Sequence, residues 1–138
     1  MNTANTSLLK KIESFKDYLS ICNNSPSEIL ATIALNNLEK FVKPNIVKIK
    51  TNLQIFDEFS NNTNLFHFQK PKSGSTAFVK LNRKETAMEF AENLVQHTGI
   101  MLLPSDTFEY GTTHLRIGFG RKNMKDVLEI LSSYITSI

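Results

Sequence analysis

Near the end of the chain a positive charge interrupts an apolar, alternating stretch: residues 114–121 read HLRIGFGR. In a β-strand successive side chains point to opposite faces, so the apolar ones would share one face while Arg116 and Gly118 share the other. A guanidinium offers paired N–H donors that match the two oxygens of a carboxylate, and a glycine beside it leaves room for a ligand. The pattern makes Arg116 a candidate carboxylate-binding residue. The alternative is a charge on the wet face of a half-solvated sheet.

Other chemistry-bearing residues give weaker patterns. The sequence has no Gly-rich phosphate loop followed by lysine, no His-x-x-x-His and no Gly-x-Ser-x-Gly. His67, His97 and His114 lie far apart, so we expect surface or strand histidines and no bound metal. Cys22, the single cysteine, excludes an internal disulfide and is expected to be a small buried hydrophobe. Arg121 follows a glycine, which favours a solvent-facing or helix-start role.

Composition limits the class of protein. With 138 residues, 41% of them hydrophobic and 21% charged, the chain has ordinary globular composition and enough length for one core. The net charge is +3, but the lysines are scattered, which indicates a solvated basic face and no nucleic-acid partner. No apolar run approaches the ~20 residues of a membrane span, and the amino terminus lacks the apolar stretch of a signal peptide. The low cysteine content makes the cytoplasm the expected location.

The first half of the chain has helical spacing. Three helices are predicted, over residues 6–21, from Ser25 to residue 42, and from Pro44 to the polar break at 60–64. Thr6 or Ser7 is the expected cap of the first helix, and Ser25 of the second, where Pro26 and Glu28 complete a helix-start pattern. Four phenylalanines fall on the apolar faces of these helices and of a later one, and are expected in the core: Phe15, Phe41, Phe56 and Phe90.

The second half changes its period. Strands are predicted over residues 65–69, 76–81, 100–104 and 114–120, with helices over 82–99 and 123–135 and loops over 70–75 and 105–113. Gly99 is the expected C-cap of the first of these helices and Asn123 the N-cap of the second. This order predicts an α+β fold: helices first, then a small antiparallel-rich β-β-α-β-β-α sheet with helices on one face.

From about residue 16 onward, several segments in order resemble one enzyme family. They read KDYLSICNNSPSEILATIAL, IKTNLQIF, PKSGSTAFVKL, HTGIMLLPSDTFE and HLRIGFG. The chain resembles the C-terminal part of class I/II aminotransferases, the fold-type I enzymes that depend on pyridoxal phosphate (PLP). The last segment is the most specific, because the family's substrate-carboxylate arginine stands in such a strand and Arg116 falls on it. Two positions depart from the family pattern: Ser75 replaces a second glycine, and Ser105 replaces the glycine after Pro104.

The resemblance implies a function for the intact enzyme. PLP would be the cofactor of the full-length protein, and an amino acid or 2-oxo acid its substrate. Arg116 would bind the substrate α-carboxylate, while Ser75 and Thr76 would line the side-chain pocket. In the family the Schiff-base lysine precedes the matched region, so we expect no catalytic residue in this chain and no activity from it alone.

The same resemblance implies a domain organisation. Residues 1–60 would lead from the absent cofactor domain, and residues 61–138 would form the small C-terminal domain. Because the apolar helix faces before residue 42 would then lack their partner, a homodimer or helix exchange between copies is expected.

Two other classes of protein share these features. One is a standalone, non-catalytic α+β module that binds a ligand or regulates another protein, and the other is a protein-interaction domain. An upstream reading frame carrying the lysine motif would favour the enzyme, whereas a natural start at Met1 would favour a standalone module.

Overall fold

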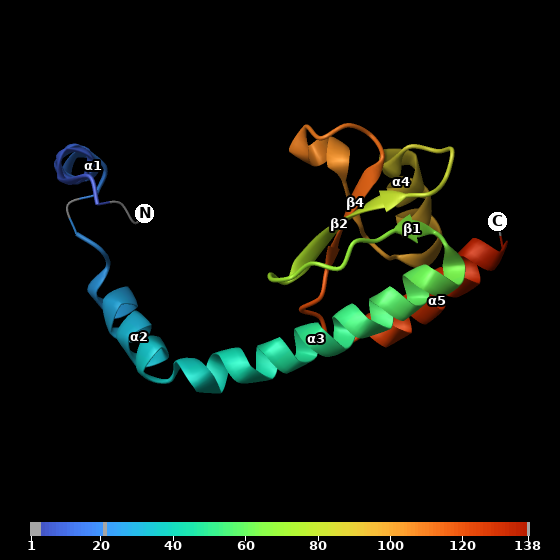
Figure 1. The fold of residues 1–138 in the computed structure, drawn as a ribbon, viewed down its shortest axis with the longest axis horizontal. Helices are drawn as coiled ribbons and strands as arrows, with labels where there is room; N and C mark the ends of the chain where they lie inside the picture. Colours follow the sequence, from blue (N-terminus) through green and yellow to red (C-terminus); the bar gives the residue numbers. More distant parts are fainter. Residues whose placement is uncertain (1–3, 21, 138) are drawn as a thin grey trace. The chain divides into compact units, whose positions relative to one another are not determined.

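The computed structural model describes residues 4–20 and 22–137, and within them the chain forms helices and one small sheet (Figure 1). In chain order the elements are α1 (Thr6–Leu19), α2 (Ser25–Asn36), α3 (Leu38–Thr63), β1 (Phe66–His67), β2 (Thr76–Leu81), α4 (Ala87–Thr98), β3 (Leu103–Pro104), the 3₁₀-helix η1 (Ser105–Phe108), β4 (His114–Gly118) and α5 (Met124–Ser137). The α+β class and the order of elements predicted from the sequence are confirmed.

The chain divides into two compact units, one ending at Phe41 and the other running from Val42 to the carboxyl terminus. The second unit holds the sheet and the buried core. Residues 42–60, which the sequence assigns to a leading helical segment, lie in this second unit. The proposed domain boundary of the whole protein at residue 60 stays a prediction.

The predicted caps of the first two helices, Thr6 or Ser7 and Ser25, are wrong, because each cap lies nearer the amino terminus. Asn5 precedes α1, and its side-chain oxygen accepts a hydrogen bond from the N–H of Leu8 at 3.0 Å, so Thr6 is already helical. Ser25 is likewise the first residue inside α2, after Asn24 at the cap position. Asparagine ranks beside serine as a cap, so sequence preference alone does not choose between neighbours. The predicted end of the first helix, Ile21, lies outside the described residues.

Pro44 lies inside α3 and does not start it, which corrects the predicted boundary. Proline has no N–H, so the helix loses the bond that residue 44 would make to the carbonyl of Lys40. Lys40 is exposed, so water can donate a hydrogen bond to its carbonyl oxygen instead. The helix consequently runs from Leu38 through the polar break to Thr63.

Two of the four phenylalanines expected in the core are exposed instead. Phe56 and Phe90 are each 1% exposed, as predicted, but Phe15 is 65% and Phe41 57% exposed. Among the described residues of α1 and α2 none is buried. Helical spacing identifies an apolar face but does not say what covers it. Cys22 is exposed as well, contrary to the expectation of a buried thiol.

The sheet has the strand order β1-β2-β4-β3, and every neighbouring pair is antiparallel. β2 has the predicted bounds. The other three strands are shorter than predicted, and η1 occupies the start of the predicted 105–113 loop. β3 keeps two residues because only Leu103 and Pro104 find partners on β4.

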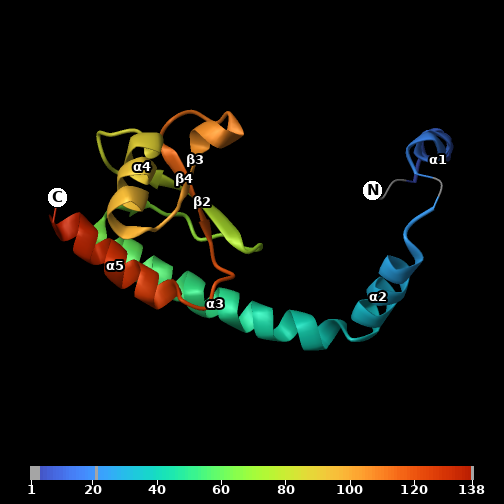
Figure 2. The same ribbon diagram turned by 180° about the vertical axis from the view of Figure 1, so that it is seen from behind.

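The core lies on one face of the sheet. Alternate residues of β2 and β4 are buried there, and the second part of α3 runs beside α5 below the sheet (Figures 1 and 2). The buried side chains come from the sheet, from the residue after β4 and from α3, α4 and α5, and they include Phe56, Val79, Phe90, Leu94, Leu115, Phe119, Leu128 and Leu131. Phe56 contacts the rings of Phe66 and Phe119 at centroid distances of 5.8 Å.

Both ends of α4 follow local rules. Thr86 and Glu89 form a capping box, in which each side chain accepts from the other residue's backbone N–H, and the bond from Thr86 N–H to Glu89 is 2.8 Å. The backbone and side-chain hydrogen bonds from Thr86 lower the pKa of Glu89 below 4.5. Gly99 ends the helix in the left-handed region at φ 74°, as predicted. Asn123 directly precedes α5, and its carbonyl accepts from the N–H of Val127 at 3.1 Å.

Candidate functional site

Arg116 stands at the centre of β4, on the face of the sheet opposite the core. Its neighbours on the strand, Leu115 and Ile117, are buried, whereas Arg116 and Gly118 are exposed. The sheet register places Arg116 between Phe78 of β2 and Leu103 of β3. The alternation predicted from the sequence is therefore present, with the guanidinium on the open side.

A cleft of about 510 Å³ opens beside this part of β4. Its walls are formed by the turn after α4, the end of β4, one side of α5 and Phe56 of α3. The lining residues include Ile100, Leu102, Arg116, Gly118, Arg121 and Val127. No aspartate, glutamate or lysine lines it among the residues that the structure describes. A Cβ placed on Gly118 would meet no other atom within 4 Å, so the space next to Arg116 is open.

The guanidinium of Arg116 is not paired with another side chain in the described part of the chain. Across residues 4–20 and 22–137 it makes no ion pair and no hydrogen bond, and the side chain of Arg121 makes none either. Arg83 differs, because its Nη1 lies 3.6 Å from Glu85. An exposed, unpaired guanidinium that lines a cleft free of carboxylates attracts anions. Arg116 is thus available to an anionic ligand, and its expected role at a carboxylate stays a prediction.

Thr76 and Ser75 lie close to the end of β4 that carries Gly118. Thr76 is directly opposite Gly118 in the sheet, and so shares the open face with Arg116. Ser75 meets β4 through its backbone, since its carbonyl accepts from the N–H of Phe119 at 2.8 Å. Both residues are exposed, and neither lines the cleft. Their expected role at a substrate side chain stays a prediction.

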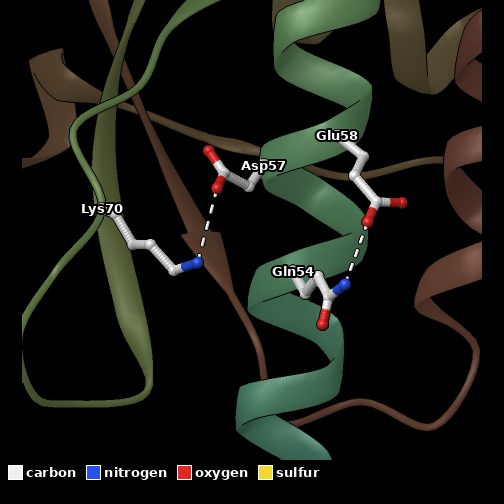
Figure 3. A network of polar contacts seen from close by, with 4 residues as sticks. All are labelled: Gln54, Asp57, Glu58 and Lys70. Carbon is white, nitrogen blue, oxygen red and sulfur yellow. Dashed lines mark hydrogen bonds and ion pairs between the residues drawn. The ribbon is translucent and has the colours of Figure 1, made fainter.

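The loop that leads to Ser75 is attached to α3 by a surface ion pair. Figure 3 shows the ammonium group of Lys70 reaching across to Asp57, with Nζ 3.4 Å from Oδ2, while Gln54 and Glu58 pair one turn apart on the same helix. The side chains of Lys70 and Asp57 are 53% and 36% exposed. At this exposure an ion pair contributes at most about 1 kcal/mol, so it stabilises the position of the loop only weakly.

Asn52 is a structural feature that the spacing of apolar residues did not predict. It lies on the core side of α3, is 5% exposed, and donates from Nδ2 to two carbonyl oxygens, those of Phe119 at 2.9 Å and Arg121 at 2.6 Å. The signal in the sequence was an amide at a position where helical spacing calls for an apolar residue, between Ile49 and Phe56. The unusual position of Asn52 could be recognised in the sequence, but the carbonyl groups that it binds could not.

Ser105, one of the two departures from the family pattern, holds the loop before β4. Its hydroxyl donates to the carbonyl of Gly111 at 2.8 Å and accepts from the N–H of His114 at 3.1 Å. The side chain is completely buried. A glycine would make neither bond, so at this position the serine itself shapes the loop.

The histidines do not form a metal site. His67 and His114 flank Lys80 across three strands, and His114 stacks on Phe78 with ring centroids 5.4 Å apart. His97 lies apart, with Nδ1 2.7 Å from the carbonyl oxygen of Asn93. Within the described part of the chain no group of three or more His, Cys, Asp or Glu could hold a metal ion, and no helix is long and apolar enough to cross a membrane.

Comparison with solved structures finds the same fold in PLP-dependent enzymes. A PLP-dependent aminotransferase from Streptococcus suis is 26% identical, with a TM-score of 0.85 over 98% of this chain and 36% of its own. An archaeal alanine:glyoxylate aminotransferase is 21% identical, with a TM-score of 0.78 over 97% of this chain and 36% of its own. The PLP-dependent cyclase OrfR is 18% identical, with a TM-score of 0.81 over 95% of this chain and 37% of its own.

These similarities confirm the resemblance predicted from the sequence. The chain is similar to PLP-dependent aminotransferases over almost all of its own residues, and it spans about a third of their length, as a fragment of one would. No protein-family model matches the sequence, and no curated protein matches it.

The residues around the cleft do not by themselves fit PLP. Covalent attachment of this cofactor needs a lysine amine, and its pyridine nitrogen needs an acidic partner. The described lining of the cleft contains neither a lysine nor a carboxylate. No chemical step of the cofactor is therefore assigned to this chain.

Proposed function

We propose that this chain is the part of a PLP-dependent aminotransferase that binds the substrate, an amino acid or 2-oxo acid, by its α-carboxylate. The supporting observation is Arg116, whose guanidinium lines an open cleft and has neither a partner nor a competing acid beside it among residues 4–20 and 22–137. The cofactor and its lysine would belong to the remainder of the enzyme, about two thirds of the length of the similar proteins. The cytoplasm is the proposed location.

Arg116 would act by orientation. Two parallel N–H···O bonds between a guanidinium and a carboxylate fix both the position and the rotation of the bound acid. Holding the substrate in one pose lowers the entropic part of the barrier to the reaction. Gly118 leaves open the space in which the rest of the substrate would lie, and Thr76 is opposite Gly118 on β2, outside the cleft.

The carboxylate site is tested by titrating the full 138-residue chain with propionate, observing the arginine Nε–Hε signals by NMR. We expect the Arg116 signal to shift and saturate, and propionamide, a neutral analogue of the same shape, to leave it in place. In Arg116→Lys the paired N–H donors of the guanidinium are lost, so propionate binding should weaken at least tenfold. Arg83→Lys is the matched control, because Arg83 pairs with Glu85 and lies outside the cleft. Equal responses to propionate and propionamide would contradict the proposal.

The chain is expected to have no aminotransferase activity alone. Incubation with PLP, an amino acid and a 2-oxo acid should produce no exchanged product above the rate of free PLP. Product formed by the isolated chain would mean that it supplies its own amine, and would contradict the division of roles.

The first unit is proposed to bring two copies together. Large apolar side chains of α1 and α2 are exposed, including Phe15, Leu19, Leu30 and Ile33. Exposed apolar surface of this kind favours association with an apolar partner, and in the isolated chain a second copy can provide it. We expect a dimer, or exchanged helices, by gel filtration with light scattering, and dissociation in Phe15→Lys. A monomer at 0.5 mM, on the order of laboratory stock concentrations, would contradict this.

A further inference from the structure

We propose that Asn52 is a positioning residue for the arginine cleft. Its buried amide fixes the turn that follows β4, and thereby the part of the cleft lining that Gly118 and Arg121 form. The inference rests on the proposed role of Arg116. It assigns a function to a residue of α3 that lies outside the cleft and would not touch the substrate.

The turn joins β4 to α5. Residues 119–121 belong to no strand or helix. Asn52 donates to the carbonyls of Phe119 and Arg121, at its first and last residue, across sequence separations of 67 and 69. A single side chain therefore spans the whole turn and ties it to a helix of the core.

The same turn is braced from β2. Phe119 donates its N–H to the carbonyl of Ser75, while its own carbonyl accepts from Asn52. Its ring packs on Phe56, which lies one helical turn beyond Asn52 on α3. Phe119 thus links the end of β4 to α3 and to the residue before β2. The Asn52 amide supplies the hydrogen bond to α3, and the Phe119 ring supplies the apolar contact.

An amide suits this position better than other side chains do. The NH₂ group of asparagine has two donor hydrogens and can serve two carbonyls at once. Serine has one donor and an ionised aspartate has none, and aspartate would also place a charge beside two carbonyl oxygens. The effect on the turn should therefore grow from Asn52→Ser through Asn52→Ala to Asn52→Asp.

α3 provides a matched control in Ser60. Ser60 has the same 5% exposure, and its hydroxyl donates to the carbonyl of Phe66 at 3.0 Å, so it also ties α3 to the sheet with a buried hydrogen bond. The difference is the location, because Ser60 serves β1, the strand at the opposite edge from the cleft. Ser60→Ala should destabilise the fold without changing the cleft.

The experiment uses the full chain and two readouts. Amide hydrogen exchange at residues 117–121 reports the turn without any ligand, and the propionate titration reports the Arg116 site. In Asn52→Ala we expect exchange at Phe119 to become at least tenfold faster and propionate affinity to fall about fivefold to tenfold, the equivalent of about one hydrogen bond. Ser60→Ala should leave both unchanged after correction for global stability.

Three results would overturn the inference. The first is unchanged exchange at residues 117–121 in a folded Asn52→Ala protein. The second is a loss of propionate affinity that is equal in Asn52→Ala and Ser60→Ala, which would make the effect general stability. The third is intact affinity in Asn52→Asp, where both bonds are absent. If wild type binds no propionate, the proposed function fails together with this inference, whereas in the three results above wild-type binding persists and the inference fails alone.

Discussion

Ser105→Ala should destabilise the second unit by about 2 kcal/mol. The substitution removes only the hydroxyl, which donates to the Gly111 carbonyl at 2.8 Å and accepts from the His114 N–H at 3.1 Å. Each such bond contributes about 0.5–1.5 kcal/mol, so losing both costs about 1–3 kcal/mol. Because the side chain is fully buried, water does not easily replace the lost partner of the His114 N–H.

Urea unfolding followed by circular dichroism measures this effect. With a slope of about 2 kcal/mol per molar urea, a loss of about 2 kcal/mol lowers the midpoint by about 1 M. The slope itself should not change, since the surface exposed on unfolding stays the same. In heat denaturation the same loss corresponds to a decrease of about 8–16 °C for a unit of this size.

Ser133→Ala is the control for the chemical change. Ser133 also donates to a backbone carbonyl, that of Glu129 at 3.0 Å, but it lies on the exposed side of α5. Alanine favours a helix, so the control should be neutral or slightly stabilising. A Ser105→Ala midpoint within about 0.2 M of wild type would refute the reasoning, because the loop would then be held without the hydroxyl.

Two further predictions concern the core and the capping box. Phe56→Ala should lower the free energy of unfolding by about 3–5 kcal/mol, because it empties a core site. Phe15→Ala should change the free energy of unfolding by less than about 0.5 kcal/mol in dilute protein, because Phe15 is exposed. Equal losses for the two variants in urea titrations would mean that Phe15 is covered. Because hydrogen bonds from Thr86 lower the pKa of Glu89 below 4.5, the ionised carboxylate contributes stability above that pH, and the contribution disappears as the pH falls through the lowered value. The stability difference between wild type and Glu89→Gln should therefore shrink between pH 6 and pH 3, and a difference that grows on acidification would contradict the capping box.

Much of the fold could be predicted because it depends on neighbours within a few residues. The bounds of β2, the left-handed cap at Gly99 and the side of β4 on which Arg116 lies all follow from local alternation and local backbone preference. The candidate arginine was identified in this way, together with the open space beside Gly118. Helix boundaries were less accurate, since several capping residues and a tolerated Pro44 compete within one turn.

The sequence by itself determined the periods of the elements, the class of the fold and the face of β4 on which Arg116 lies. Only the tertiary structure decided that Arg121 shares a cleft with Arg116, that Asn52 holds the turn between them, and that the apolar faces of α1 and α2 are exposed. The physical reason is distance along the chain. A hydrogen bond between residues 52 and 121 depends on how α3 packs against the sheet, and no local preference of either residue specifies that packing.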